Sequence, residues 1–225
     1  MEEERGTHGA AKELKQRERL YARQLKIKRD AKMAFETIAD DNWNFMVVDF
    51  EAYERDQKVI TEAGITTRIG GQWQSSHIRI ANYSHLRNGK YVPDEVDNFR
   101  FGQSVFLTKA VLREKLSGML QIPNLILVAH GFTNELKYLR LLGITIPPEV
   151  RMLDTQNVFS YFKASKPSSN LSDVYVSLRA MLKVLNIHPF CLHNAGNDSK
   201  YTSDALQLMV AAFDNSMFED MALEI

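Results

Sequence analysis

Two carboxylates stand two residues apart at the end of an apolar run. Asp49 and Glu51 follow Phe45–Val48, and because successive side chains of a strand point to opposite faces, the two acids share one face. Carboxylates gathered beside a buried strand repel each other and lose hydration. A divalent cation such as Mg²⁺ or Mn²⁺ relieves that cost by binding their oxygens. The pair is a candidate metal site, unless the strand ends at Phe50 and Glu51 is solvated.

A histidine and an aspartate lie five residues apart just before an expected helix. Asp198, at the helix start, could supply another metal ligand. His193 could deprotonate an attacking water, since imidazole titrates near neutral pH. The structural alternative is that Asn197 or Asp198 caps the helix and that His193 is a loop residue.

A third segment, His130–Glu135, separates an expected strand from an expected helix. Glu135 falls in the first helical turn, where the helix dipole favours an acid whether or not that acid has a chemical role. Each of the three segments therefore has an ordinary structural interpretation when it is taken alone.

In order and spacing, the three segments together resemble the DEDD exonuclease superfamily, in its histidine-bearing subclass of RNase H-like fold. Asp49–Glu51 resembles the first motif and His130–Glu135 the second. His193–Asp198 resembles the third, with an alanine two residues and an aspartate five residues after the histidine. Asp154–Thr155 falls where members of this superfamily often open a helix with an Asp-Thr pair.

A narrower resemblance is to a fungal family named for being good for the full activity of a DEAD-box RNA helicase in mRNA export. Its C-terminal domain is exonuclease-like, and the similarity covers roughly residues 44–215. The segments that carry it are Asp49–Glu54, Arg87–Val92, Phe101–Ser104 and His193–Asp198. This resemblance implies an RNA helicase or mRNA export factors as partners.

The resemblance implies metal-dependent 3′–5′ hydrolysis of single-stranded nucleic acid, with RNA as the expected polymer. Asp49, Glu51 and Asp198 would hold one Mg²⁺ or Mn²⁺ ion, and Asp49 and Glu135 would share a second ion. His193 would accept the proton of the attacking water. Phe50, close to the first motif, would either stack on a terminal base or pack in the core.

One position departs from the superfamily pattern. The second motif usually has aspartate where this chain has Glu135, and the extra methylene moves the carboxylate by about 1.5 Å in a site that must place two metals precisely apart. Gly131 also replaces the more frequent asparagine after the histidine. A non-catalytic binding module for RNA or protein therefore stays open as an alternative, as does a small-molecule metal hydrolase.

Short apolar runs and longer amphipathic segments predict an α/β fold, an RNase H-like five-stranded mixed sheet flanked by helices. The expected strands cover residues 45–51, 59–69, 77–81, 125–129 and 152–153. The expected helices cover about 10–38, 108–120, 134–142, a segment from 155, 174–185 and 198–212. We divide the chain into a basic helical extension (1–41), the exonuclease-like domain (42–215) and an acidic tail (216–225).

The 225 residues carry 28 basic and 28 acidic side chains, which argues against a uniformly basic coat for nucleic acid. Between Arg5 and Lys32, however, ten basic residues face three acidic ones, a net charge of +7. This segment is either a solvated helix with one narrow packing stripe or an arm that contacts phosphates. The single cysteine, Cys191, excludes an internal disulfide, and no apolar run suggests a signal or membrane span. We expect an intracellular protein, cytoplasmic or nuclear, with no membrane partner.

Overall fold

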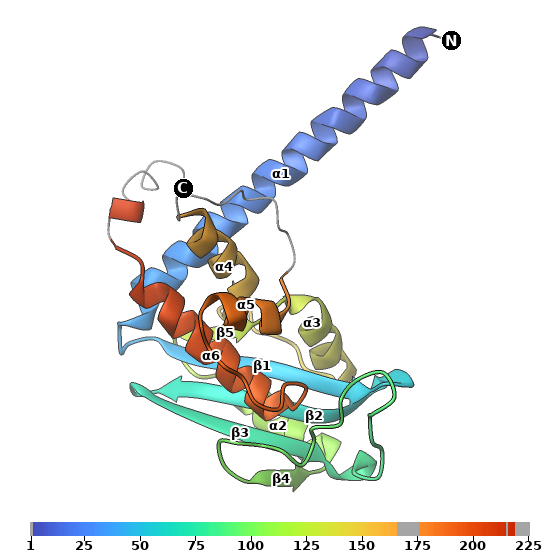
Figure 1. Ribbon diagram of the computed structural model, residues 1–225, viewed down its shortest axis with the longest axis vertical. Coiled ribbons are helices and arrows are strands. Elements are labelled where there is room, and N and C mark those ends of the chain that lie inside the picture. The colour runs from blue at the N-terminus through green and yellow to red at the C-terminus, as the bar shows by residue number, and fades with distance from the viewer. Residues whose placement is uncertain (1, 166–175, 215, 219–225) are drawn as a thin grey trace.

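The computed structural model describes residues 2–165, 176–214 and 216–218, with side chains from Glu13 onward. Its strands are β1 (Asn44–Tyr53), β2 (Asp56–Ile69), β3 (Gln72–Ile80), β4 (Ser104–Leu107), β5 (Leu125–Ala129) and β6 (Arg151–Asp154). Its helices are α1 (Glu2–Ile38), α2 (Lys109–Met119), α3 (Phe132–Leu141), α4 (Thr155–Ala164), α5 (Leu178–Val184) and α6 (Ala195–Ala211), with a short 3-10 turn at Ala81–Tyr83. Figure 1 shows their arrangement.

The strands form one mixed sheet in the order β4-β3-β2-β1-β5-β6. The strands β1, β2 and β3 run antiparallel to one another as a meander, whereas β4, β5 and β6 each pair in parallel with their neighbour. The predicted α/β class and RNase H-like mixed sheet are thus confirmed, but the predicted number of five strands is wrong. The sixth strand is β4, whose four residues alternate in no clear apolar pattern and pair only with the end of β3.

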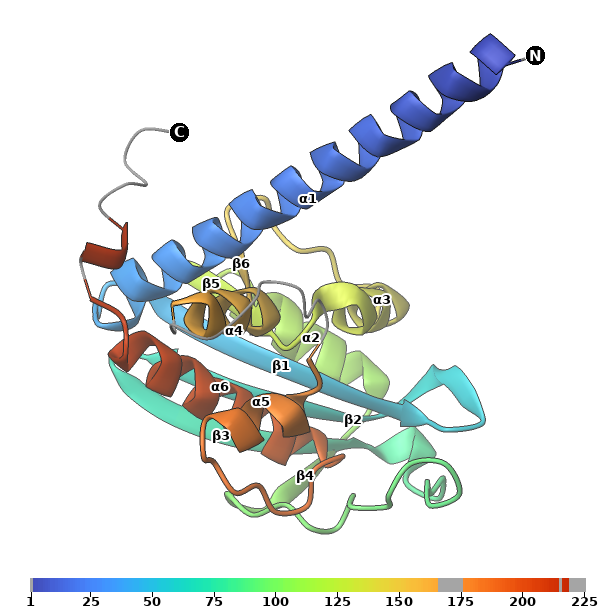
Figure 2. The ribbon, with the colours of Figure 1, turned by 45° about the horizontal axis from the view of Figure 1, so that its top comes forward.

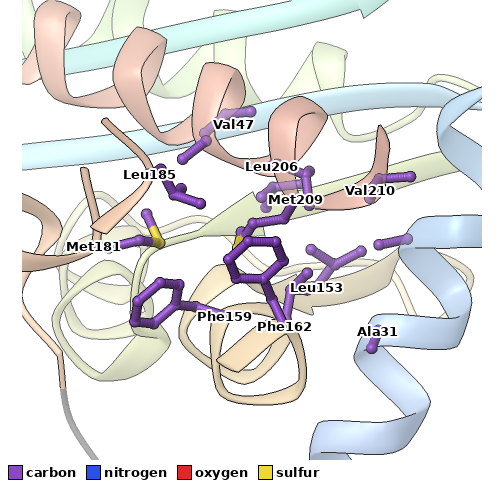
Figure 3. Packing of buried hydrophobic residues seen from close by; sticks show 14 of the residues in the cluster. Ala31, Val47, Leu153, Phe159, Phe162, Met181, Leu185, Leu206, Met209 and Val210 are labelled. Atoms are coloured by element: carbon purple, nitrogen blue, oxygen red, sulfur yellow. The ribbon is translucent and has the colours of Figure 1, made fainter. Parts of the chain in front are cut away.

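Two cores lie on the two faces of the sheet. One, drawn in part in Figure 3, joins β1, β5 and β6 to α1, α4, α5 and α6. The other joins the opposite face to α2 and α3. Strand β1 is central and contributes to both, because Phe45 and Val47 enter the first core and Met46 and Val48 the second.

Helix α1 has two different halves. Its C-terminal half is part of the first core, where Ile27, Ala31 and Ala34 are buried. The N-terminal part extends away from the body of the protein, as Figure 2 shows. The helix begins at Glu2 rather than near Ala10, but it ends at Ile38 as predicted. The domain boundary near residue 41 stays a prediction.

Several helix ends agree with the capping chemistry of the sequence. The hydroxyl of Thr108 accepts a hydrogen bond from the Val111 N–H and caps α2. Asp154 caps α4 in the same way. Helix α6, in contrast, begins at Ala195 and is capped by Asn194, so the structural alternative of a cap at Asn197 or Asp198 is wrong.

Part of the predicted helix over 174–185 lies outside the described residues, and so does most of the expected acidic tail. Among the residues that are described, none of the helices is apolar over a length that would cross a bilayer.

Candidate active site

Asp49 and Glu51 lie on the same face of β1, as the spacing predicts. Their intervening neighbour Phe50 points the other way, is 5% exposed and packs against the ring of Tyr138 at a centroid distance of 6.1 Å. Phe50 is therefore a core residue and does not stack on bases. The two carboxylates face the side of the sheet that α6 covers.

The first turn of α6 brings Asp198 and the preceding His193 together. The backbone N–H of His193 donates a hydrogen bond to Asp198 Oδ2 at 3.0 Å. His193 has a φ of +76°, a left-handed conformation that is unfavourable for a side chain with a Cβ and is held here by the surrounding contacts. This turn fixes the imidazole relative to the helix that carries the carboxylate.

Three of the predicted residues form one compact cluster. A ligand atom from each of Glu51, His193 and Asp198 lies within 4.8 Å of the other two. Nδ1 of His193 is 3.7 Å from Oε1 of Glu51. Residues separated by more than 140 positions in the chain thus meet where β1 ends beside the start of α6.

The other two predicted acids act on this cluster through their charge. Burial raises the pKa of Asp49 well above its ordinary value, and the charges of Asp198, Glu51 and Glu135 raise it further. Glu135, in the first turn of α3, is 7% exposed. Burial raises the pKa of Glu135 to about 7, with contributions from the charges of Asp154 and Glu51. The four carboxylates therefore form one electrostatically coupled group.

Two buried oxygens in this group have no hydrogen-bond donor within the described part of the chain. They are Oε2 of Glu135 and Oδ1 of Asp198. Burial raises the pKa of Asp198 as well, to about 7, and the charge of Glu51 adds to the effect. Buried carboxylate oxygens without donors are costly unless a proton or a cation compensates them. Hard divalent cations prefer such oxygens, so the donor set fits Mg²⁺ or Mn²⁺.

The raised pKa of the carboxylates favours their neutral forms, whereas the raised pKa of His193 favours its charged form. Contact with the Glu51 carboxylate raises the pKa of His193, and the charges of Glu51 and Asp198 act in the same direction. Because Nδ1 faces Glu51, the other ring nitrogen, Nε2, is the one left to exchange a proton with a substrate or water.

The histidine of the second motif has a structural role. His130 Nδ1 is 3.0 Å from the hydroxyl of Thr155, and its Nε2 is 2.7 Å from the carbonyl of Val176. Burial lowers the pKa of His130 to about 4, so the ring is neutral. It joins the ends of β5 and α4 to the segment before α5 and does not belong to the acidic group.

Sequence reasoning missed a buried acid beside the site. Glu62 on β2 lies directly across from Glu51 and is 3% exposed. Its Oε2 is 2.8 Å from Nε2 of the buried His77, whose Nδ1 contacts the hydroxyl of Ser104 at 2.7 Å. The same oxygen accepts a 3.4 Å hydrogen bond from Ala195 N–H at the start of α6. Only the β1–β2 register reveals this role, so no local sequence signal could have indicated it.

The structure also explains the two asparagines within the third motif. Asn194 donates to the carbonyls of Glu95 and Val96 at 3.0 and 3.3 Å. Asn197 accepts from the Arg100 N–H at 2.9 Å and donates to the carbonyl of Asn98 at 3.0 Å. Both asparagines thus attach the loop of residues 84–103 to the helix that carries Asp198.

A carboxylate at the end of β1 holds the other part of the same loop. Glu54 accepts backbone hydrogen bonds from Gly89, Lys90, Tyr91 and Val92, at 2.8 Å from Tyr91. These hydrogen bonds, led by that from Tyr91, lower the pKa of Glu54. The loop that carries the Arg87–Val92 segment is therefore attached both to β1 and to α6.

Comparison with known proteins agrees with this architecture. The DEDDh family model described as "DNA polymerase III subunit epsilon-like, C-terminal domain" matches residues 44–209. An uncharacterized nucleolar protein of Schizosaccharomyces pombe is 53% identical over 196 residues, which cover 86% of this chain and 80% of that protein. Good for full DBP5 activity protein 2 of Saccharomyces cerevisiae is 27% identical over 198 residues, and the similar region spans only 33% of its length.

Solved structures resemble the chain in fold. Escherichia coli exonuclease I in complex with a dA16 oligonucleotide superposes with a TM-score of 0.51 and 12% identity, over 80% of this chain and 43% of that one. Its zinc-bound complex with single-stranded DNA gives a TM-score of 0.52 at 13% identity, over 80% of this chain and 42% of that one. At this level of identity the similarity concerns the fold.

Proposed function

Because the chain belongs to the DEDDh exonuclease-like family, we propose that it is a metal-dependent 3′–5′ exonuclease that hydrolyses single-stranded nucleic acid. The observation that carries the proposal is that two buried oxygens, on Glu135 and Asp198, have no hydrogen-bond donor among the described residues, and that Asp198 clusters with Glu51 and His193. A group of coupled, buried acids of this kind is stable in its charged form only with a cation.

Asp49, Glu51, Glu135 and Asp198 would hold the cations, with two Mg²⁺ or Mn²⁺ ions as the proposed complement. When bound, such ions lower the pKa of an attacking water and stabilise negative charge on a phosphate. Carboxylates on the end of one strand and the starts of two helices can bind ions from several directions. The positive ends of the α3 and α6 dipoles favour an anionic substrate nearby.

His193 is the proposed general base. Glu51 orients the imidazole from the Nδ1 side, so Nε2 accepts the proton of the attacking water. The hydrogen bond from its backbone to Asp198 keeps the ring beside the acids while the proton moves. This role requires the neutral imidazole, although contact with Glu51 raises the pKa of His193. Compensation of the Glu51 charge is therefore a condition for activity at neutral pH.

RNA is the proposed polymer and the nucleus the proposed location. One relative is nucleolar, and another is named for full activity of DBP5. Together with the family resemblance to a factor of a DEAD-box RNA helicase, these names favour an RNA substrate and helicase or mRNA export partners over DNA repair.

The direct test is degradation of a 5′-labelled single-stranded RNA in Mn²⁺ or Mg²⁺, with a DNA of the same sequence and a 3′-blocked RNA alongside. We expect a ladder that shortens from the free 3′ end and stops in EDTA. Asp49→Asn and His193→Ala should abolish it, whereas His188→Ala, an exposed histidine on the same segment, should not. Wild-type protein that leaves all substrates intact in both metals would refute the nuclease.

Metal binding can be measured without turnover. Mn²⁺ should raise the melting temperature of the wild-type protein through preferential binding to the folded state. Asp198→Asn should remove that increase. The matched control is Asp204→Asn on the same helix, which removes an acid paired with Lys200 and outside the cluster.

The alternative is a non-catalytic binding module, and Glu135 is the residue that favours it. If RNA binds to the wild-type protein with an affinity that Mn²⁺ increases, but no shortening follows, the module is the correct interpretation. Asp49, Glu51, His193 and Asp198 would then bind ions and phosphate without hydrolysis.

A further inference from the structure

Four basic residues of α1 lie on a single face of the projecting helix. Lys15, Arg19, Arg23 and Lys26 are separated by four, four and three positions, the spacing that places residues above one another on a helix. Lys15, Arg19 and Lys26 are exposed. From Lys15 to Lys26 the row is about 16 Å long, at 1.5 Å per residue. We call these four residues the basic row.

The row leads toward the candidate active site. The next residue on the same face, Asp30, is buried and accepts hydrogen bonds from the N–H of Asp154 at 3.4 Å and from Asn157 Nδ2 at 2.6 Å. Asp154 in turn accepts from the N–H of Gly131, which precedes α3 and its residue Glu135. This face of α1 therefore packs against the end of the edge strand β6, close to the start of α3.

Electrostatics give the same placement. Burial raises the pKa of Asp154, and the ammonium of Lys26 opposes that increase, so Lys26 lies close to this carboxyl. The inner end of the basic row thus lies beside the carboxylate that accepts a hydrogen bond from Gly131, the residue that precedes α3.

We propose that the basic row is a track for the phosphates of a single-stranded nucleic acid whose 3′ end occupies the candidate active site. The proposal rests on the proposed function and adds to it a path for the part of the strand that is not being hydrolysed. Regularly spaced cations on a rigid helix match a chain of phosphates and bind it without regard to sequence.

The chain offers a closely matched control. Arg17 and Lys28 each lie two positions after a member of the basic row, about 200° around the helix. Both are exposed. Arg19→Gln/Lys26→Gln and Arg17→Gln/Lys28→Gln therefore remove the same charges, one arginine and one lysine, from opposite faces of the same helix.

The experiment measures affinity in EDTA, where hydrolysis does not interfere, for labelled single strands of about 6 and about 20 nucleotides. For the longer strand, Arg19→Gln/Lys26→Gln should reduce the slope of log affinity against log salt by about 1.4, the contribution of two phosphates. Arg17→Gln/Lys28→Gln should leave that slope close to the wild-type value. Circular dichroism of both variants checks that α1 remains helical.

Three results would overturn the track. Equal losses in the two variants would mean that the helix attracts the strand only by its overall charge, and unchanged slopes in both would mean that it does not bind the strand. Binding of polyglutamate with the same dependence on the basic row would mean that the partner is an acidic protein. Shortening of the 6-nucleotide RNA in Mn²⁺ by the Arg19→Gln/Lys26→Gln variant tests the active site separately, because neither residue belongs to the acidic group.

Discussion

Strand β2 and helix α6 touch at Gly64 and Ala195, where a methyl group on the glycine would overlap the carbonyl of Ala195. The helix that carries Asp198 therefore begins in direct contact with the sheet. Gly196, in the first turn of α6, makes a second close contact of this kind. A Cβ on Gly196 would lie 2.6 Å from the Cβ of His77 and 2.7 Å from the ring of Phe99. The absence of side chains at Gly64 and Gly196 allows the start of α6 to lie close against β2 and β3.

Gly64→Ala should consequently be among the most damaging single substitutions in this fold. A backbone carbonyl cannot rotate away as a side chain can, so we expect a loss of about 3 kcal/mol or more in the free energy of unfolding. Gly118→Ala provides the control, because that helical glycine has open space around it. It should stabilise the protein by roughly 0.5–1 kcal/mol through helix propensity. Urea titrations of both variants decide the matter, and equal effects would contradict the close contact.

Asn197→Ala should weaken the attachment between α6 and the loop of residues 84–103. The buried side chain makes hydrogen bonds to the backbone of Arg100, Asn98 and Cys191, and removing it breaks all three. We expect a loss of about 2 kcal/mol and faster proteolysis within the loop. Asn98→Ala, an exposed side chain bonded to Glu95, should change neither by a comparable amount.

Stability in EDTA should fall as the pH rises from about 4 to 7. Burial raises the pKa of Glu135 from 4.5 to about 7 and that of Asp198 from 3.8 to about 7. The folded state therefore holds protons that the unfolded state has released, and their contribution to stability is lost as the pH passes through the folded-state pKa. Burial lowers the pKa of His130 to about 4, so this one residue favours the unfolded state at low pH. Its effect is opposite in sign to that of the several buried carboxylates.

Denaturation in EDTA at about pH 5 and pH 8 tests this sign. The wild-type protein should be more stable at the lower pH, and Mn²⁺ should restore stability at the higher one. The Glu135→Gln/Asp198→Asn variant should show a much smaller difference between the two conditions. A wild-type protein that gains stability toward pH 8 in EDTA would contradict the coupled acidic group.

Glu135→Asp tests whether the longer side chain of glutamate is needed to place this carboxylate in the site. Shortening the side chain withdraws the carboxylate by about 1.5 Å from its buried position, and catalytic groups must be placed to within about 0.5 Å. We expect Mn²⁺ affinity and RNA hydrolysis to fall at least tenfold. Glu135→Gln, which keeps the length but loses the charge, should reduce both further. An increase in hydrolysis with aspartate would instead show that Glu135 weakens an ancestral nuclease site.

Residues that act within one short segment could be predicted, whereas residues that act through pairing could not. The shared face of Asp49 and Glu51 follows from the two-residue period of a strand, and β5 was predicted with its observed bounds because its five residues are all buried. Glu62 gave no signal, since its position opposite Glu51 depends on the β1–β2 register and on the bulge after Glu51. The short strand β4 was missed for the same reason, because a parallel partner distant in sequence defines it.

Helix α6 lies near the C-terminal end of the described residues, and that position has a consequence during synthesis. A growing chain contains Asp49 and Glu51 about 150 residues before it contains Asp198. At about 5–20 residues per second, the interval is roughly 7–30 s. Throughout it the nascent protein, surrounded by ribosomal and messenger RNA, lacks both the third-motif acid and the proposed base. Because His193 and Asp198 lie late in the chain, the acidic group stays incomplete until most of the domain has been synthesised.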